Sequence, residues 1–205
     1  MDINKIHNQD CLEAMKLMQD NEFDLAIVDP PYRDSKDNDM NQWNRKTIKD
    51  GRLKNWNDKP NKEYFNELQR VSKEQIIWGA NNFSLEFKGF VVWRKKSISL
   101  NFNMSMAELA STSDGLSTIS KVCEFSPQQK DRIHPTQKPV KLYEWLLINY
   151  AKEGDKILDT HLGSGSIAIA CHNLGYDLTG YELDKEYYDN AIKRIKNHQA
   201  QTRIF

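Results

Sequence analysis

The 205-residue chain has few cysteines and no long apolar run. Its three cysteines, Cys11, Cys123 and Cys171, include no C-x-x-C spacing, so they support neither a disulfide framework nor a zinc site, and no metal is expected. No apolar run approaches the length of a membrane span, so we expect no membrane partner. The 29 basic and 29 acidic side chains give a formal net charge of zero. Binding of nucleic acid therefore needs a local basic patch, because the chain has no overall basic field.

The length and the composition of the chain predict one folded unit. A hydrophobic content of 39% with 28% charged residues is typical of a soluble globular protein. A chain of this size can bury a core of its own, so residues 1–205 are expected to form a single domain. The first ten residues, MDINKIHNQD, have no apolar stretch of the kind that a signal peptide requires. We therefore expect a cytoplasmic protein with reduced thiols.

Strand-like and helix-like patterns alternate along the chain. Residues 24–28 are apolar without alternation, which favours a strand buried on both faces, as in a parallel sheet. The alternation predicts an α/β, Rossmann-like fold in which a mainly parallel sheet has helices on both faces. The further predicted strands are 75–79, 89–95, 118–125, 155–159 and 177–182, and the predicted helices are 10–20, 61–72, 138–151, 164–174 and 184–199.

Residues 33–59 are polar and almost free of aliphatic side chains. The segment has eight basic and five acidic residues, which makes it locally basic in an otherwise neutral chain. A loop of this length in a compact domain is usually functional or disordered. We expect it to be a mobile loop.

A glycine-containing loop lies between a predicted strand and a predicted helix. Its residues Gly163, Ser164 and Gly165 let the backbone approach a ligand closely, and the helix that follows offers free N–H groups. Glu182 ends the next predicted strand about 20 residues on, where an acid typically binds a ribose diol. Ala168 stands where a third glycine would complete a dinucleotide fingerprint. The loop alone therefore leaves a dinucleotide and another adenosine cofactor as alternatives.

The stretch Asp29-Pro30-Pro31-Tyr32 directly follows the strand predicted at 24–28. It is therefore expected at the carboxyl edge of the sheet, where open α/β folds bind ligands. The prolines fix two φ angles and remove two N–H donors. The Asp29 carboxylate and the Pro30 carbonyl are then two acceptors beside a flat ring, which suits a planar heterocycle that carries an amino group. Two hydrogen bonds and a stacked ring would hold the amino group in place, so catalysis would depend on positioning and electrostatics. The alternative is that Asp29-Pro30-Pro31 is only a rigid turn with no catalytic role.

Three motifs together resemble a known family. DPPY at 29–32, HPTQKPVKLYEWLL at 134–147 and ILDTHLGSGSIAIAC at 157–171 look like the S-adenosylmethionine-dependent DNA amino-methyltransferases. Their order, with the catalytic motif before the glycine loop, resembles the permuted beta group. HNQDCLEAM at 7–15 and IIWGANNF at 76–83 also fit, so the resemblance spans most of the chain. It implies a circularly permuted methyltransferase order, S-adenosyl-L-methionine as cofactor, DNA as partner and a flipped-out target base.

The resemblance also implies roles for individual residues. Asp29, Pro30 and Tyr32 would hold and stack the target base, with Pro31 setting the turn. Glu182 would bind the ribose hydroxyls of the cofactor. The cofactor-binding set that the resemblance implies is Asp10, Cys11, Asp29, Thr136, Lys138, Asp159, His161, Gly163, Ser164, Gly165 and Glu182.

Three of these positions have alternative explanations. Asp10 would contact the adenine amino group of the cofactor, but it is also a good helix N-cap. Lys138 would pair with the methionine carboxylate, but a lysine near a helix start is usually just solvated. Thr160-His161 stands where the family commonly has Pro-Phe or a similar pair. His161 therefore either stacks in place of the aromatic ring or turns outward, and no proton-transfer role is assigned to it.

The expected methyl acceptor is N6 of adenine, because the aspartate of DPPY resembles adenine-N6 enzymes more than cytosine-N4 enzymes, which more often have serine. Cytosine N4 is the alternative. Two segments are candidates for DNA contact: the 33–59 loop, with Trp43 and Trp56, and residues 94–133, a small target-recognition insert that begins Arg94-Lys95-Lys96. Basic residues there would contact phosphates, and polar side chains would read base edges.

Two other classes of protein compete with this interpretation. A dinucleotide-dependent oxidoreductase explains the glycine loop and Glu182 but leaves DPPY without a task. A catalytically silent DNA-binding protein has no need for the intact motif at 29–32. RNA or protein amide groups are further acceptors that DPPY permits, and a homodimer remains an open alternative.

Overall fold

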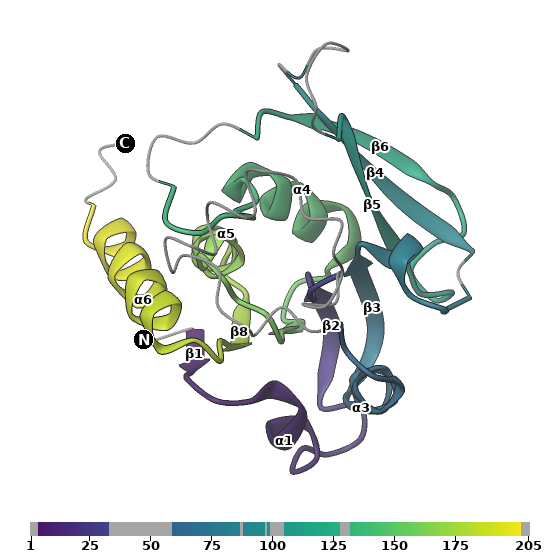
Figure 1. The fold of residues 1–205 in the computed structure, drawn as a ribbon, viewed down its shortest axis with the longest axis horizontal. Coiled ribbons are helices and arrows are strands. Elements are labelled where there is room, and N and C mark those ends of the chain that lie inside the picture. The colour runs from purple at the N-terminus through teal and green to yellow at the C-terminus, as the bar shows by residue number, and fades with distance from the viewer. Residues whose placement is uncertain are drawn as a thin grey trace, which may run out of the picture.

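The computed structural model describes residues 4–32, 59–86, 88–96, 98, 105–127 and 132–201. Nearly all of the predicted 33–59 loop lies outside these residues, as does part of the predicted 94–133 insert. The described part contains one eight-stranded sheet with the order β1-β8-β7-β2-β3-β5-β4-β6 (Figure 1). The mixed α/β fold that the sequence predicted is confirmed.

The elements alternate along the chain much as the sequence patterns predict. The strands are β1 Asn4–His7, β2 Phe23–Val28, β3 Ser72–Trp78, β4 Gly89–Lys95, β5 Ala107–Thr112, β6 Lys121–Phe125, β7 Lys156–Asp159 and β8 Asp177–Tyr181. The helices are α1 Cys11–Met15, α3 Lys62–Val71, the short 3-10 turn η1 Ala80–Asn82, α4 Val140–Tyr150, α5 Ser166–Leu174 and α6 Lys185–Gln199.

The sequence patterns did not predict two of the strands, β1 and β5. β1 is NKIH, a four-residue edge strand with one aliphatic residue, and β5 is AELAST, in which small and polar residues give no clear period. The predicted helix at 10–20 is also shorter in the structure, since α1 spans Cys11–Met15. The described part of 94–133 contributes β5 and β6 to the main sheet, and its role in target recognition stays a prediction.

The sheet is mainly parallel, as predicted. β1, β8, β7, β2 and β3 are parallel neighbours, and only β5 runs antiparallel to both of its neighbours, β3 and β4. β2 and β7 lie side by side, with Leu25 opposite Ile157 and Ala26 opposite Leu158. The strand before DPPY thus precedes the strand before the glycine loop in sequence, which is the predicted permuted order.

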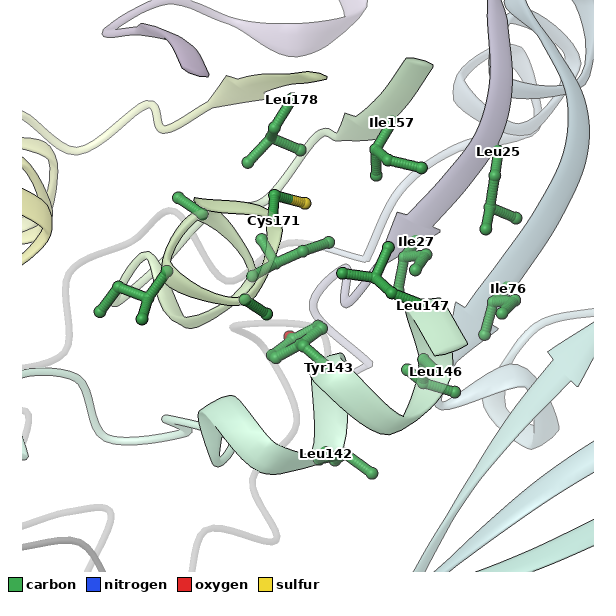
Figure 2. Close-up of a cluster of buried hydrophobic side chains, with 14 of the residues drawn as sticks. Leu25, Ile27, Ile76, Leu142, Tyr143, Leu146, Leu147, Ile157, Cys171 and Leu178 are labelled. Carbon is green, nitrogen blue, oxygen red and sulfur yellow. The ribbon is translucent and has the colours of Figure 1, made fainter. Parts of the chain in front are cut away.

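Helices cover both faces of the sheet, and β2 shows this, since its successive side chains point to opposite faces and pack against different helices. Leu25 and Ile27 belong to the core cluster that contains residues of α4, α5 and α6. Figure 2 shows this cluster, to which α4 contributes Leu146 and Leu147 and β2 contributes Leu25 and Ile27. Ala26 of β2 joins the second cluster, with residues of α1 and α3. Each fully buried leucine or isoleucine stabilises the fold by about 1.5–3 kcal/mol.

The chain connections diverge between β7 and β2. β7 leads through α5 to β8, whereas β2 leads through α3 to β3 on the other side and the other face. Such a topological switch point leaves an opening beyond the carboxyl ends of the two strands, and open α/β sheets bind ligands there. DPPY follows β2 and the glycine loop follows β7, so the fold places both motifs at this point.

None of the helices in the described ranges has both the length and the apolar character needed to cross a bilayer. Within the same ranges, no group of three or more His, Cys, Asp or Glu side chains is arranged to hold a metal ion.

Candidate functional site

The predicted site residues gather along one edge of the sheet. Because β1, β8, β7, β2 and β3 are parallel, the residues that follow them share the carboxyl edge. In strand order, Asp10 follows β1, Glu182 follows β8, Asp159 ends β7, Asp29 follows β2, and Gly79, which the sequence did not predict as a site residue, follows β3. Side chains from distant parts of the sequence therefore form one row, with Asp159 and Asp29 as its central neighbours.

Both carboxylate oxygens of Asp29 are engaged. The Tyr32 hydroxyl donates to Asp29 Oδ1 at 2.5 Å, and the Lys138 ammonium donates to Asp29 Oδ2 at 2.5 Å. Lys138 Nζ also donates to Tyr32 Oη at 3.2 Å. Burial, and then the nearby Asp29 carboxylate, raises the pKa of Tyr32 well above its usual value, so the tyrosine is a neutral donor. The acceptor predicted for a substrate amine is thus held by two donors of the chain itself.

The Tyr32 ring lies on the backbone of Gly79. Gly79 has a φ of 68°, and a Cβ at this position would lie 2.2 Å from Tyr32 Cε1. Phe83 meets the ring edge-on, with the two ring centroids 6.5 Å apart. The IIWGANNF segment, to which the sequence assigned no role, is therefore the support for Tyr32, and only glycine fits at its centre.

Lys138 is buried between two carboxylates. Its side chain is 3% exposed, and its Nζ lies 3.1 Å from Glu108 Oε2 as well as against Asp29. The ammonium also lies 5.1 Å from the centroid of the Trp78 ring. Burial lowers the pKa of Lys138, but the two carboxylates outweigh it and hold the pKa well above its usual value. Lys138 is therefore a fixed cation, and its predicted contact with a methionine carboxylate stays a prediction.

Glu108 is the residue of this site that the sequence did not reveal. Its Oε1 lies 2.5 Å from Lys95 Nζ, so the carboxylate bridges two ammonium groups. Burial acts to raise the pKa of Glu108, but Lys138 and Lys95 outweigh it and lower the pKa to about 2. Glu108 lies on the unpredicted strand β5, in a stretch with no motif. Its partner Lys138 is far away in sequence, so only the fold brings the two together.

The glycine loop is tied to Glu182. The backbone N–H of Gly163 donates to Glu182 Oε2 at 2.9 Å, and the N–H of Asp184 donates to Oε1 at 2.9 Å. Gly163 and Gly165 have φ values of 54° and 72°, which L side chains rarely adopt. Burial raises the pKa of Glu182. The loop and the predicted ribose acid thus form one unit, and each carboxylate oxygen keeps a second lone pair for a ligand.

Asp159 and the Thr160-His161 pair lie beside the loop. Asp159 Oδ1 accepts the backbone N–H of His161 at 2.9 Å, and burial raises the pKa of this carboxyl to about 8. The His161 ring packs edge-on against Tyr64 with centroids 5.4 Å apart, and Thr160 Oγ1 lies 2.6 Å from the Tyr64 hydroxyl. Burial lowers the pKa of His161 to about 4, so the ring is neutral near pH 7. His161 therefore packs inward.

The remaining predicted cofactor residues have structural contacts. Asp10 caps α1, since its Oδ1 accepts the N–H of Leu12 at 2.8 Å and of Glu13 at 3.2 Å. Burial raises the pKa of Cys11 to about 12, which keeps its thiol neutral. The N-cap alternative for Asp10 is confirmed, and its contact with a cofactor stays a prediction.

The segment 134–138 connects the two motifs. Thr136 Oγ1 lies 3.1 Å from His134 Nδ1, and the His134 ring is the nearest side chain to Gly163, about 3.6 Å from where its Cβ would be. At the other end of the segment, Lys138 contacts Asp29. One short stretch before α4 therefore touches both the glycine loop and the DPPY turn.

Comparison with solved structures defines the class of fold. The crystal structure of the M1.HpyAVI–SAM complex aligns with a TM-score of 0.64 at 20% identity, covering 94% of this chain and 98% of that chain. The cytosine-N4-specific PvuII DNA methyltransferase gives 0.64 at 11% identity, with coverage of 95% and 90%. TTHA0409 of Thermus thermophilus, complexed with S-adenosyl-L-methionine, gives 0.61 at 14% identity and covers 97% of each chain. The chain has the fold of these proteins.

Comparison of sequences points to the same group. Residues 110–193 match the model of the DNA methylase family. The type II methyltransferase M.HpaI of Haemophilus parainfluenzae is 38% identical over 80 residues, which are 37% of this chain and 26% of that protein. M2.DpnII of Streptococcus pneumoniae is 43% identical over 63 residues, 31% of this chain and 24% of that protein. The matches thus span about a quarter of the length of these curated relatives. The resemblance to DNA amino-methyltransferases is confirmed.

Proposed function

We propose that the chain is a DNA amino-methyltransferase that transfers a methyl group from S-adenosyl-L-methionine to N6 of adenine in a flipped-out base. The observation that carries this proposal is the adjacency of β2 and β7, which brings the DPPY turn and the glycine loop together at the topological switch point. A direct methyl transfer needs the amine and the cofactor side by side. The family match over residues 110–193 supports a DNA methylase, without distinction between N6 of adenine and N4 of cytosine.

The chemistry of the glycine-loop side fits S-adenosyl-L-methionine. Glu182 holds the loop through two backbone N–H groups and has lone pairs left for two ribose hydroxyls. Asp159 is a buried carboxyl whose pKa burial raises to about 8, and none of the described residues forms an ion pair with it. A bound cation would stabilise its ionised form. The cofactor has a sulfonium and an ammonium group, so its charge complements Asp159.

The DPPY side holds the amino group. Tyr32 leaves Asp29 Oδ1 when its ring stacks on the target base, and a hydrogen of the base amine then occupies that oxygen. The Pro30 carbonyl accepts the second amine hydrogen. Lys138 stays on Asp29 Oδ2 and keeps the carboxylate oriented. Stacking and the two hydrogen bonds offset the unpairing of the base, which costs a few kcal/mol.

When bound, S-adenosyl-L-methionine supplies an electrophilic methyl group, so that the N–C bond forms as the C–S bond breaks, the bonding electron pair goes to sulfur, and a proton leaves the nitrogen for water. Asp29 acts by orienting the amine, so that its lone pair faces the methyl group. The rate enhancement on this scheme comes from positioning and electrostatics. No covalent enzyme intermediate is required.

Adenine is preferred over cytosine because of Asp29. Among the solved structures of this fold, the PvuII methyltransferase is cytosine-N4-specific by its title, so the fold alone does not choose the base. The aspartate at the first position of DPPY resembles adenine-N6 enzymes. The oxidoreductase alternative still leaves residues 29–32 without a task, and no contact in the described residues favours it.

The test is transfer of a tritiated methyl group from S-adenosyl-L-methionine to unmethylated genomic DNA, followed by nucleoside analysis of the product. We expect 6-methyladenine from the wild type and no label from Asp29→Ala, with Asp29→Asn as the isosteric variant. Asp24→Asn is the matched control, because Asp24 lies at the other end of β2, where it pairs with Lys73 at 2.6 Å. The proposal would be refuted by label that does not depend on Asp29, or by the absence of label in any DNA. If the labelled product is 4-methylcytosine, the target base is cytosine and not adenine.

A further inference from the structure

Glu108 reaches the DPPY turn because β5 is antiparallel to its neighbours. Trp78, the last residue of β3, pairs with Ala110 of β5. The chain of β5 enters the sheet at the edge where β3 leaves it, so Glu108, two residues before Ala110, lies at the carboxyl edge beyond Trp78. A strand that no motif marks thus delivers a carboxylate to the candidate site.

The charged groups at this edge form a chain of alternating sign. It runs from Lys95 to Glu108 at 2.5 Å, from Glu108 to Lys138 at 3.1 Å and from Lys138 to Asp29 at 2.5 Å. The side chains of Lys138, Asp29 and Glu108 are 3%, 14% and 24% exposed, so water screens these charges little. Buried carboxylates interact with one ammonium more strongly than surface groups do. The charge of Glu108 therefore affects the strength of the interaction between the Lys138 ammonium and the Asp29 carboxylate.

We propose that Glu108 is a positioning residue for the methyl transfer, which acts by sharing the Lys138 ammonium with Asp29. This inference rests on the proposed function. With the ammonium divided between two carboxylates, Asp29 keeps the negative charge and the orientation that it needs to accept a hydrogen from the substrate amine. Without Glu108, the charge of Lys138 acts on Asp29 alone, at the same 2.5 Å, and weakens it as an acceptor. The loss falls on the chemical step, because no contact in the described residues joins Glu108 to the glycine loop.

Glu108→Gln tests the inference, because the amide keeps the shape of the side chain and removes its charge. We expect kcat on unmethylated genomic DNA to fall about 10–100-fold, as for other small misplacements of reacting groups. The KM for S-adenosyl-L-methionine should stay unchanged. Glu108→Asp, which keeps the charge, should retain more of the activity than Glu108→Gln.

Glu144→Gln is the matched control. Glu144 is a similarly buried carboxylate, with 13% of its side chain exposed and Lys141 at 2.9 Å, but it lies on α4 away from Asp29. Its removal should leave kcat unchanged. An equal loss of kcat in Glu108→Asp and Glu108→Gln, or in Glu144→Gln, would overturn the role of the Glu108 charge.

A spectroscopic readout separates this inference from the proposed function. A ¹H–¹⁵N spectrum of lysine ammonium groups should show a protected Lys138 signal, assigned by its loss in Lys138→Met. Glu108→Gln should shift that signal, whereas an unshifted signal would overturn the inference. If the wild type labels no DNA, the proposed function fails and takes the positioning role of Glu108 with it. If the wild type labels DNA and Glu108→Gln keeps its kcat, only the inference fails.

Discussion

Replacement of Lys138 by methionine is the most direct test of the buried charge network. Methionine keeps most of the length and apolar stem of lysine but removes the ammonium that neutralises Asp29 and Glu108. Both carboxylates are mostly buried, so the change leaves Asp29 without its cation and Glu108 with Lys95 alone in a poorly solvated site. Removal of one partner of a buried ion pair costs about 3–5 kcal/mol. We expect a loss of this size in the free energy of unfolding at pH 7.5.

The loss should depend on pH with a definite sign. In the wild type the pKa of Glu108 is about 2, below its usual 4.5, so its contribution to stability is complete above pH 4.5 and is lost only as pH falls toward 2. In Lys138→Met only Lys95 still opposes the burial of Glu108, so the pKa of Glu108 rises from its wild-type value of about 2. The variant is then penalised at neutral pH, and protonation of the carboxyl relieves the penalty as pH falls.

Urea denaturation of both proteins at pH 7.5 and pH 3.5 measures this difference, because protonation of Glu108 falls in the range between its usual 4.5 and about 2. The matched control is Lys141→Met, three residues along the chain, where the lysine side chain is 78% exposed and pairs with Glu144. An exposed pair of this kind contributes about 0–1 kcal/mol. A destabilisation of Lys138→Met no larger than that of the control, or one equal at both pH values, would refute the argument.

Three further predictions concern other residues of the site. Gly79→Ala should lose about 2 kcal/mol or more of stability, because it combines a strained φ of 68° with a clash against Tyr32. Gly175→Ala is the control for strain alone, because Gly175 has a φ of 79° and no atom within 4 Å of the added Cβ. Thermal melting compares the two variants, and equal losses of stability would contradict the clash. Burial lowers the pKa of His161 from 6.5 to about 4, so the contribution of the neutral ring to stability is complete above pH 6.5 and is lost as pH falls toward 4. In His161→Gln the urea midpoint should therefore depend less on pH between pH 7.5 and 5. An unchanged pH dependence would count against burial of the neutral ring. Glu182→Gln should weaken binding of S-adenosylhomocysteine about 10-fold or more in calorimetry, since hydrogen bonds to charged groups contribute about 1.5–3 kcal/mol, and an unaltered affinity would remove Glu182 from the ribose site.

Much of the site could be predicted from local sequence patterns. The unbroken apolar run before Asp29 indicated a buried parallel strand, and β2 is that strand. The glycines at 163 and 165 indicated a loop between a strand and a helix, and both lie between β7 and α5. These predictions succeeded because each feature depends on residues that are close together in the sequence.

The charge network could not be predicted in the same way. Lys138 and Asp29 are 109 residues apart, and the sequence predicted a methionine carboxylate or solvent around Lys138, not Asp29. Glu108 lies on a strand of small and polar residues that the sequence patterns did not reveal. Which acid neutralises a buried lysine depends on how strands pair, and strand pairing is a long-range property of the fold.

The sequence by itself determined the chemical groups of the candidate site: a stiff turn with two acceptors and a ring at 29–32, a glycine loop at 163–165, and an acid at the end of the following strand. These follow from residue type and from short-range backbone preference. The tertiary structure alone decided their neighbours. Parallel pairing of β2 with β7 placed the two motifs side by side, and the antiparallel entry of β5 brought Glu108 to the ammonium that Asp29 already holds. The physical reason is that buried charges must be paired, and only the folded chain brings the paired residues next to each other.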